Sequence, residues 1–202
     1  MKSFSAPISA FLLIIAIQCL DLQAEIEKVV ITWTPMKCQN WCIQEIDKQF
    51  RRVPEIAEVE VNKEAGQANI TWQKNARFDY MSVNMVMHQL GLAIRDIRLK
   101  VRGHIRHTDK TVTLVSSGDL TTFDLINAVI PQSTAQSVQF NLAARALQPD
   151  MRQKLLEAEA QKQEVTIDGP LFMPHRAPPL VLAAEHVNFP PPDDAKQKNK
   201  LK

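Results

Sequence analysis

The hydrophobic pattern between residues 27 and 97 constrains this chain most, because its period switches between that of a strand and that of a helix. Apolar side chains alternate along 27–33, which predicts a half-buried strand. From Cys42 to Val53 they recur at spacings of four, four and three, on one face of a helix. Pro54 cannot continue that helix and ends it.

The switching continues beyond Pro54. Alternation predicts strands over 57–61 and 68–72, joined by a polar turn. Asp79 is the expected N-cap of a second helix, which Gly91 ends, and a further strand starts at Ile94. The helix should bury Val83, Leu90 and either Met87 or Val86. The order βαββαβ predicts a ferredoxin-like sandwich, so the fold class is α+β.

A second β-rich unit is predicted after residue 97. Strand patterns cover 97–105, 112–116 and 121–125, then a helical segment covers about 142–161, and two more strands cover 164–167 and 180–184. Three strands, a helix and two strands is the order of a five-stranded OB-like barrel. Gly103 and Gly169 would suit sharp bends in its strands. The alternative is an irregular α+β extension.

The first 24 residues are typical of a secretion signal. Lys2 precedes the apolar run 11–17, and the small residue Ala24 marks the expected cleavage site. Such a run is far shorter than the roughly 20 residues that span a bilayer, so no stable membrane span is expected after signal removal. The alternatives are an uncleaved anchor, a buried helix, or a lipoprotein acylated at Cys19. We therefore expect an exported protein, periplasmic or extracellular.

Domain organisation and composition follow from these patterns. We expect a signal peptide over 1–24, a βαββαβ domain over 25–97, an OB-like domain over 98–189 and a disordered tail over 190–202. Apolar residues make up 45% of the chain, as in globular proteins. The net charge of +2 predicts no strong attraction to nucleic acid or anionic lipid.

Two cysteines remain after signal cleavage, and they form one site. Cys38 lies in the loop before the first predicted helix, and Cys42 lies in or near its first turn. The free N–H groups and positive dipole of a helix N-terminus stabilise a thiolate. Two thiolates there are a bidentate site for Cu(I), Hg(II) or Zn(II), with Lys37 offsetting negative charge.

Residues 28–97 resemble the heavy-metal-associated domain of copper chaperones and mercury-binding proteins. The resemblance rests on Met-x-Cys at 36–38, the helical Cys42, and matching positions at Ile46, Phe50, Val53, Pro54, Val61, Asn62, Ala68, Ile70, Leu90 and Gly91. It implies a metal held by Cys38 and Cys42, with Met36 packing beneath the loop. Cu(I) is the favoured ion, and Zn(II) and Hg(II) remain alternatives. A protein partner for metal transfer or docking is implied as well.

The chain departs from the family pattern at three positions. Three residues separate Cys38 from Cys42 instead of two, Pro35 replaces a glycine, and Leu92 replaces a tyrosine or lysine. The alternatives for the pair are a short disulfide, a redox role, or free thiols. With a disulfide, the protein would be a non-catalytic envelope interaction or assembly protein.

Other candidate sites are weaker. Met81, Met85, Met87 and His88 crowd the second helix, and we interpret them as packing. His104 and His107 should lie on opposite faces of a strand. The OB-like unit has no Trp or Tyr platform for nucleic acid, so it is expected to bind protein. No phosphate loop or catalytic triad is present, and we expect no enzyme.

Overall fold

The computed structural model describes residues 26–34, 40–128 and 145–190. Within them the chain is α+β, and its strands form one 9-stranded sheet. The elements in chain order are β1 (Ile26–Thr32), α1 (Asn40–Phe50), β2 (Ile56–Asn62), β3 (Gln67–Trp72), α2 (Tyr80–Gln89), β4 (Asp96–His107), β5 (Val112–Ser116), β6 (Thr122–Asn127), α3 (Pro149–Ala160), β7 (Glu164–Phe172), β8 (Leu180–Ala184) and β9 (His186–Asn188).

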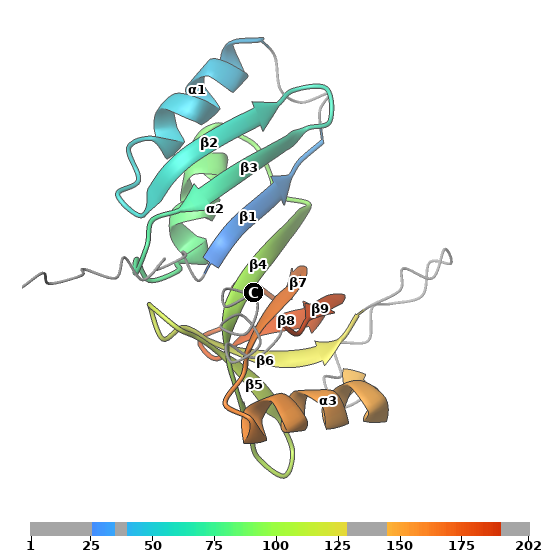
Figure 1. Cartoon of the computed structure of the whole chain (residues 1–202). Coiled ribbons are helices and arrows are strands. Elements are labelled where there is room, and N and C mark those ends of the chain that lie inside the picture. Colours follow the sequence, from blue (N-terminus) through green and yellow to red (C-terminus); the bar gives the residue numbers. More distant parts are fainter. Residues whose placement is uncertain (1–25, 35–39, 129–144, 191–202) are drawn as a thin grey trace, which may run out of the picture.

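The first part of the chain is an antiparallel sheet with two helices. Its strands follow the order β2-β3-β1-β4 (Figure 1). Val29 and Ile31 are fully buried on one face of β1, and the core there also contains Ile46 and Phe50 of α1 and Val83 of α2. Both helices therefore cover the same face, and the order of elements is the predicted βαββαβ.

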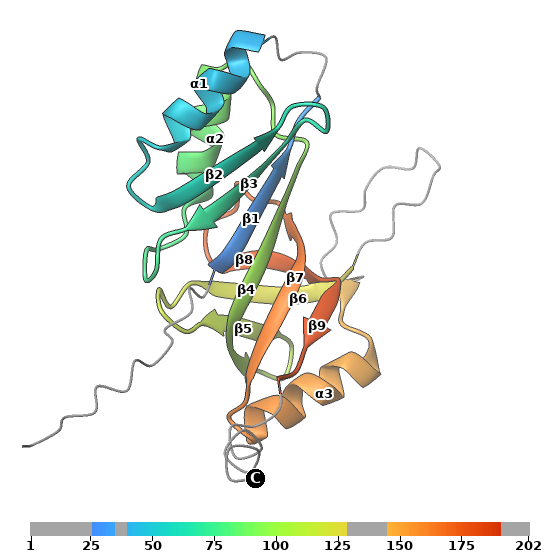
Figure 2. The same cartoon turned by 45° about the horizontal axis from the view of Figure 1, so that its top comes forward.

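The second part is a closed five-stranded barrel. β4 pairs with β5, β5 with β6, β6 with β8, β8 with β7, and β7 returns to β4 (Figure 2). Only the β6–β8 pair among these is parallel. The predicted five-stranded barrel is confirmed.

Strand β4 belongs to both parts. Its first half, Asp96 to Val101, pairs with β1, while residues 98–104 pair with β7 and residues 103–107 pair with β5. Salt bridges from Arg98 to Asp168 and Glu185 reinforce the contacts with the second part. Burial opposes the charge on Arg98, but the hydrogen bonds that its guanidinium donates to the two carboxylates, together with their negative charge, outweigh burial and raise its pKa. The boundary that the sequence suggests after Ile97 lies inside this continuous strand.

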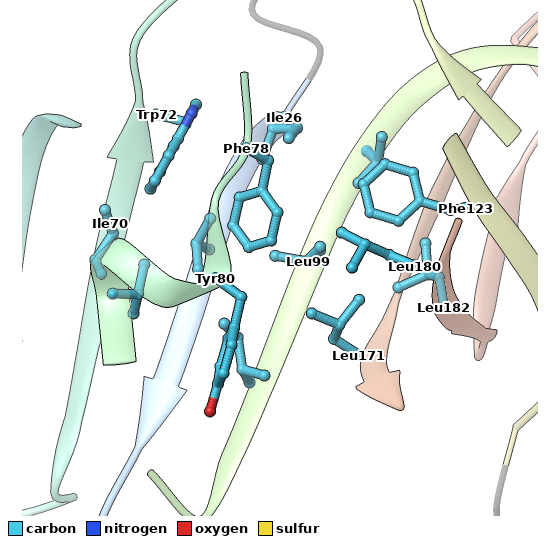
Figure 3. Close-up of a cluster of buried hydrophobic side chains, with 14 of the residues drawn as sticks. Ile26, Ile70, Trp72, Phe78, Tyr80, Leu99, Phe123, Leu171, Leu180 and Leu182 are labelled. Atoms are coloured by element: carbon cyan, nitrogen blue, oxygen red, sulfur yellow. The ribbon is translucent and has the colours of Figure 1, made fainter. Parts of the chain in front are cut away.

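The hydrophobic core is likewise continuous across β4. One cluster of buried residues contains Trp72 and Phe78 of the first part together with Phe123 and Leu182 of the barrel. Figure 3 shows Leu99 of β4 between these two groups. The rings of Trp72 and Phe78 are 5.2 Å apart at a tilted angle. The two parts therefore share one continuous hydrophobic core.

Two glycines allow close contact between barrel strands. A Cβ at Gly103 would overlap the backbone carbonyl of Val115, and one at Gly169 would overlap that of Ala183. Glycine is the residue that permits such an approach. The sequence suggested both glycines for sharp bends, whereas the structure shows that they permit close approach of β4 to β5 and of β7 to β8.

The structure confirms the expected caps of α2. The Asp79 carboxylate accepts hydrogen bonds from the N–H groups of Met81 and Ser82. Gly91 follows the helix at a positive φ of 69°, which glycine adopts without strain.

The structure corrects the bounds of two later elements. The helix predicted from about residue 142 begins at Pro149, whose missing N–H and fixed φ suit the first turn. Residues 142–144 lie outside the described residues. β7 extends to Phe172, beyond the predicted end at Ile167, because pairing with β4 continues through Pro170. The short β9 was not predicted.

Other predictions concern parts of the chain that are not described. The signal peptide over 1–24, with Cys19, and the tail beyond Pro190 lie outside the described residues. Within the described ranges, no helix combines the length and the apolar character that a bilayer-spanning segment requires.

Candidate metal centre

The predicted thiol site lies at the connection from β1 to α1. β1 ends at Thr32 and α1 begins at Asn40, so the backbone of Cys42 is in the first helical turn. Cys38 belongs to residues 35–39, which lie outside the described part, and so do Met36 and Lys37. The predicted helical position of Cys42 is therefore observed for its backbone, while the ligand role of both cysteines stays a prediction.

The first turn of α1 is suited to negative charge. The first four N–H groups of a helix lack partners within the helix, and they carry the positive end of its dipole. The turn that contains Cys42 has no acidic residue, so no carboxylate of this turn competes for those groups. A thiolate at this position would be stabilised by the backbone itself.

The end of β1 is fixed on both sides. The Trp33 amide donates to the Gly66 carbonyl at 2.8 Å, and the Arg95 amide donates to the Thr32 carbonyl at 2.8 Å. The Trp33 side chain is buried, and its indole Nε1 has no hydrogen-bond partner among the described residues. The connection from β1 to α1 therefore starts from a strand end that hydrogen bonds hold on both sides.

Helix α1 is held in place by its inner face and by local ion pairs. Ile46 and Phe50 are fully buried. On the outer face Lys48 pairs with Glu45 at 3.2 Å, and Arg51 pairs with Asp47 at 2.9 Å. The hydrogen bond from Lys48 lowers the pKa of Glu45, and the hydrogen bond to Asp47 raises that of Arg51. These contacts fix the helix that positions Cys42.

Leu92 lies where the resemblance places a metal-adjacent tyrosine or lysine. Its side chain is buried, and its amide donates to the Met87 carbonyl at 2.9 Å. This position therefore contributes to the core instead of offering a polar group.

The methionines of α2 and the histidines of β4, which the sequence offered as weaker candidates, lie in different surroundings. Met87 is fully buried, which confirms packing for that residue, whereas Met81 and Met85 are exposed. His107 contacts Glu159 of α3, and His104 lies 3.8 Å from Glu164 of β7, so the two histidines do not share a site. No cluster of three or more His, Cys, Asp or Glu side chains suited to a metal occurs in the residues that the structure describes.

A cavity of about 890 Å³ lies where α2 begins, next to the β5–β6 and β7–β8 loops. Tyr80 lines it and packs edge-on against His175, with ring centres 4.9 Å apart. Burial raises the pKa of the Tyr80 hydroxyl. Arg77 and Arg176 also line the cavity. Sequence patterns gave no signal for it, because its walls come from four segments far apart in the chain.

Asp119 shapes one wall of this cavity. Its carboxylate accepts the Phe78 amide at 3.0 Å, the Thr121 amide at 3.2 Å and the hydroxyls of Ser116 and Thr121. The Phe78 bond ties the β5–β6 loop of the barrel to the segment that leads into α2. The carboxylate of Asp119 thus joins two segments of the chain and is used for these internal hydrogen bonds.

No family model matches the chain, and no curated protein matches it. A solved structure described as "Crosstalk between Cu(I) and Zn(II) homeostasis" is similar to one part of it. That likeness has 17% identity and a TM-score of 0.30, and it covers 34% of this chain and 96% of the other. A TM-score this low supports no conclusion on fold or function.

Proposed function

We propose that this protein is an exported, non-enzymatic binder of a soft metal ion, with Cys38 and Cys42 as thiolate ligands. The observation that carries the proposal is the place of Cys42 in the first turn of α1, directly after the loop that follows β1. Cu(I) is the favoured ion because two thiolates form a soft, low-coordinate site, and Zn(II) and Hg(II) are the alternatives. The ion is cargo, and in this proposal it is transferred to a partner by exchange of the two thiolate ligands.

The architecture supports this proposal. We assign the part from β1 to the start of β4 to the ferredoxin-like sandwich of heavy-metal-associated domains, since its strands follow the order β2-β3-β1-β4. We assign the remainder to an OB-like barrel, on the basis of five strands with one parallel pair. In this proposal the barrel supplies a docking surface for the protein that delivers or receives the metal.

Removing both thiols should abolish tight Cu(I) binding. We expect the reduced protein to take one equivalent of Cu(I) from a competing chelator. The Cys38→Ser/Cys42→Ser variant should bind it more than about 100-fold more weakly, since even outer-shell changes cost 10- to 100-fold. Chelator competition with an optical readout measures both. No other cysteine remains in the mature chain after cleavage at Ala24, so any residual binding by the double variant would come from donors other than thiols. Equal affinity of the double variant would overturn the proposal.

The second candidate is an envelope interaction or assembly protein with a Cys38–Cys42 disulfide. The cavity between α2 and the barrel loops favours it, because Leu120 lines that cavity and is 69% exposed. An exposed apolar side chain in a hollow is the kind of surface that binds a protein segment.

The state of the thiols in the isolated protein separates the two candidates. For a metal carrier we expect Cys38 and Cys42 to react with a thiol reagent once a chelator has removed the metal, without any reductant. A quantitative disulfide that resists mild reductant would favour the assembly protein instead. Mass spectrometry after alkylation, with and without reductant, gives the answer for each cysteine.

A further inference from the structure

The cavity at the start of α2 combines a rigid apolar floor with two exposed apolar side chains. Its volume of about 890 Å³ falls in the range of binding pockets, roughly 300–1,000 Å³. Phe78, Tyr80 and Leu180 line it and are buried, since they belong to the shared core (Figure 3). Met81 of α2 and Leu120 of the β5–β6 loop line it as well, at 52% and 69% exposure. The recess is therefore preformed, and part of its apolar surface is in water.

The backbone at Leu120 is strained. Its φ of 57° lies in the left-handed region, where the Cβ of an L-residue crowds the following carbonyl oxygen. Glycine would fit this turn without that strain, and a polar residue would suit its exposure better. Strained residues gather at binding sites, where the rest of the structure holds them in place. A partner that covers the Leu120 side chain would account for both its exposure and its conformation.

Two arginines bring unpaired positive charge to the same cavity. Arg77 precedes α2 and Arg176 lies in the β7–β8 loop, and both are exposed. Neither guanidinium forms an ion pair with any residue that the structure describes. Arg51 and Arg98, in contrast, each pair with a carboxylate elsewhere in the molecule. Arg77 and Arg176 are thus available to an anionic group of a ligand.

Most of the negative charge in the cavity is already used by the fold. The Asp79 carboxylate accepts the amides of Met81 and Ser82 and lies at the positive end of the α2 dipole. The Asp119 carboxylate accepts the internal hydrogen bonds described above. Glu55 is the third carboxylate of the lining, and its side chain forms no hydrogen bond with a described residue. Two free guanidinium groups against one free carboxylate favour an acidic ligand.

We propose that this cavity binds a segment of a partner protein in which acidic residues flank a large apolar residue. The carboxylates would pair with Arg77 and Arg176, because a guanidinium can donate two parallel hydrogen bonds to a carboxylate. The apolar side chain would cover Leu120 and Met81 and enter the recess, as interface anchors do. This inference rests on the docking role proposed for the barrel and gives that role a place and a partner class. It requires neither the metal nor the thiols.

The test uses the full protein and three end-blocked, fluorophore-labelled octapeptides. The first has Asp-Phe-Glu-Leu at its centre, the second has lysine in place of both acidic residues, and the third has serine in place of both apolar residues. Fluorescence anisotropy should show saturable binding of the first peptide, at least about tenfold tighter than of the other two, because one charge-assisted hydrogen bond contributes that much. NMR should show shifts of the Leu120 and Met81 methyl groups. The methyl group of Met151 on α3, outside the cavity, should not move.

Charge reversal at the cavity should exchange the preferred peptide. Arg77→Glu/Arg176→Glu should bind the acidic peptide at least about tenfold more weakly and should bind the lysine peptide instead. Arg106→Glu/Lys110→Glu is the matched control, because it makes the same change in net charge at exposed positions outside the cavity. This control should leave the affinity for the acidic peptide unchanged.

A third variant tests the strained leucine. Leu120→Gly should weaken binding of the acidic peptide without lowering the unfolding midpoint, since glycine adopts the positive φ freely. Equal binding of all three peptides, undiminished binding after charge reversal, or binding of decanoate but of no peptide would overturn the proposal. Cu(I) binding is measured separately by chelator competition, so failure of this site and failure of the thiol site are distinguishable.

Discussion

Replacing Gly103 with alanine should destabilise the protein by about 3 kcal/mol or more, at the upper end of the range for overpacked sites. The added methyl group would overlap the Val115 carbonyl, a backbone atom of the adjacent strand. Relief requires β4 and β5 to separate where Gly103 pairs with Ser116. Urea unfolding followed by circular dichroism measures the loss. Gly169→Ala should behave similarly, because its methyl group would overlap the Ala183 carbonyl.

Gly91→Ala is the matched control for that prediction. A Cβ at Gly91 meets no atom within 4 Å, so only the positive φ of 69° opposes the substitution. The expected loss is about 1 kcal/mol, the cost of placing an L-residue in this region. If Gly103→Ala cost no more than Gly91→Ala, the close approach of β4 to β5 would be wrong.

Replacing Leu99 with alanine should weaken both parts of the molecule together. Leu99 is 1% exposed and lies in the shared core, opposite Val29 of β1 and Gly169 of β7. Truncating a buried leucine costs about 2–5 kcal/mol. Since β4 and the core are common to both parts, we expect one unfolding transition at a lower denaturant concentration.

Two probes test whether the parts unfold together. The three tryptophans, Trp33, Trp41 and Trp72, all belong to the first part, so their fluorescence reports on it. Amide resonances of Phe123 and Leu125 report on the barrel. The two midpoints should coincide before and after the substitution. A shift in only one of them would show that the parts are independent. Leu120→Ala, at a 69% exposed position, should change stability by less than about 0.5 kcal/mol.

The candidate sites differ in how far the sequence could locate them. The spacing of Ile46 and Phe50 was enough to predict the α1 face and hence the helical position of Cys42. The same reasoning predicted that Val83, either Met87 or Val86, and Leu90 face the core. Val83, Val86 and Met87 are buried, whereas Leu90 is only partly buried. The exposure of Met81 and Met85 follows from that choice of face, yet their apolar character made packing the simpler interpretation. Only the structure showed that both side chains stay about half exposed among the described residues.

Local physics explains what the sequence by itself determined. The order of elements, the Asp79 cap and the turn at Gly91 depend on residues close together in the chain, where hydrophobic period, capping and φ preference act directly. The predicted barrel strands at 112–116 and 180–184 were found at those positions for the same reason.

Contacts between distant residues explain what only the tertiary structure decided. Closure of the barrel needs β4 to pair with β7, and residues such as Arg98 and Pro170 are brought together by no local pattern. The use of β4 by both parts, the cavity beside Tyr80 and the hydrogen bond from Phe78 to Asp119 likewise join residues that are far apart in the chain. A side-chain period reports which face of an element is apolar, but it does not report which distant element covers that face.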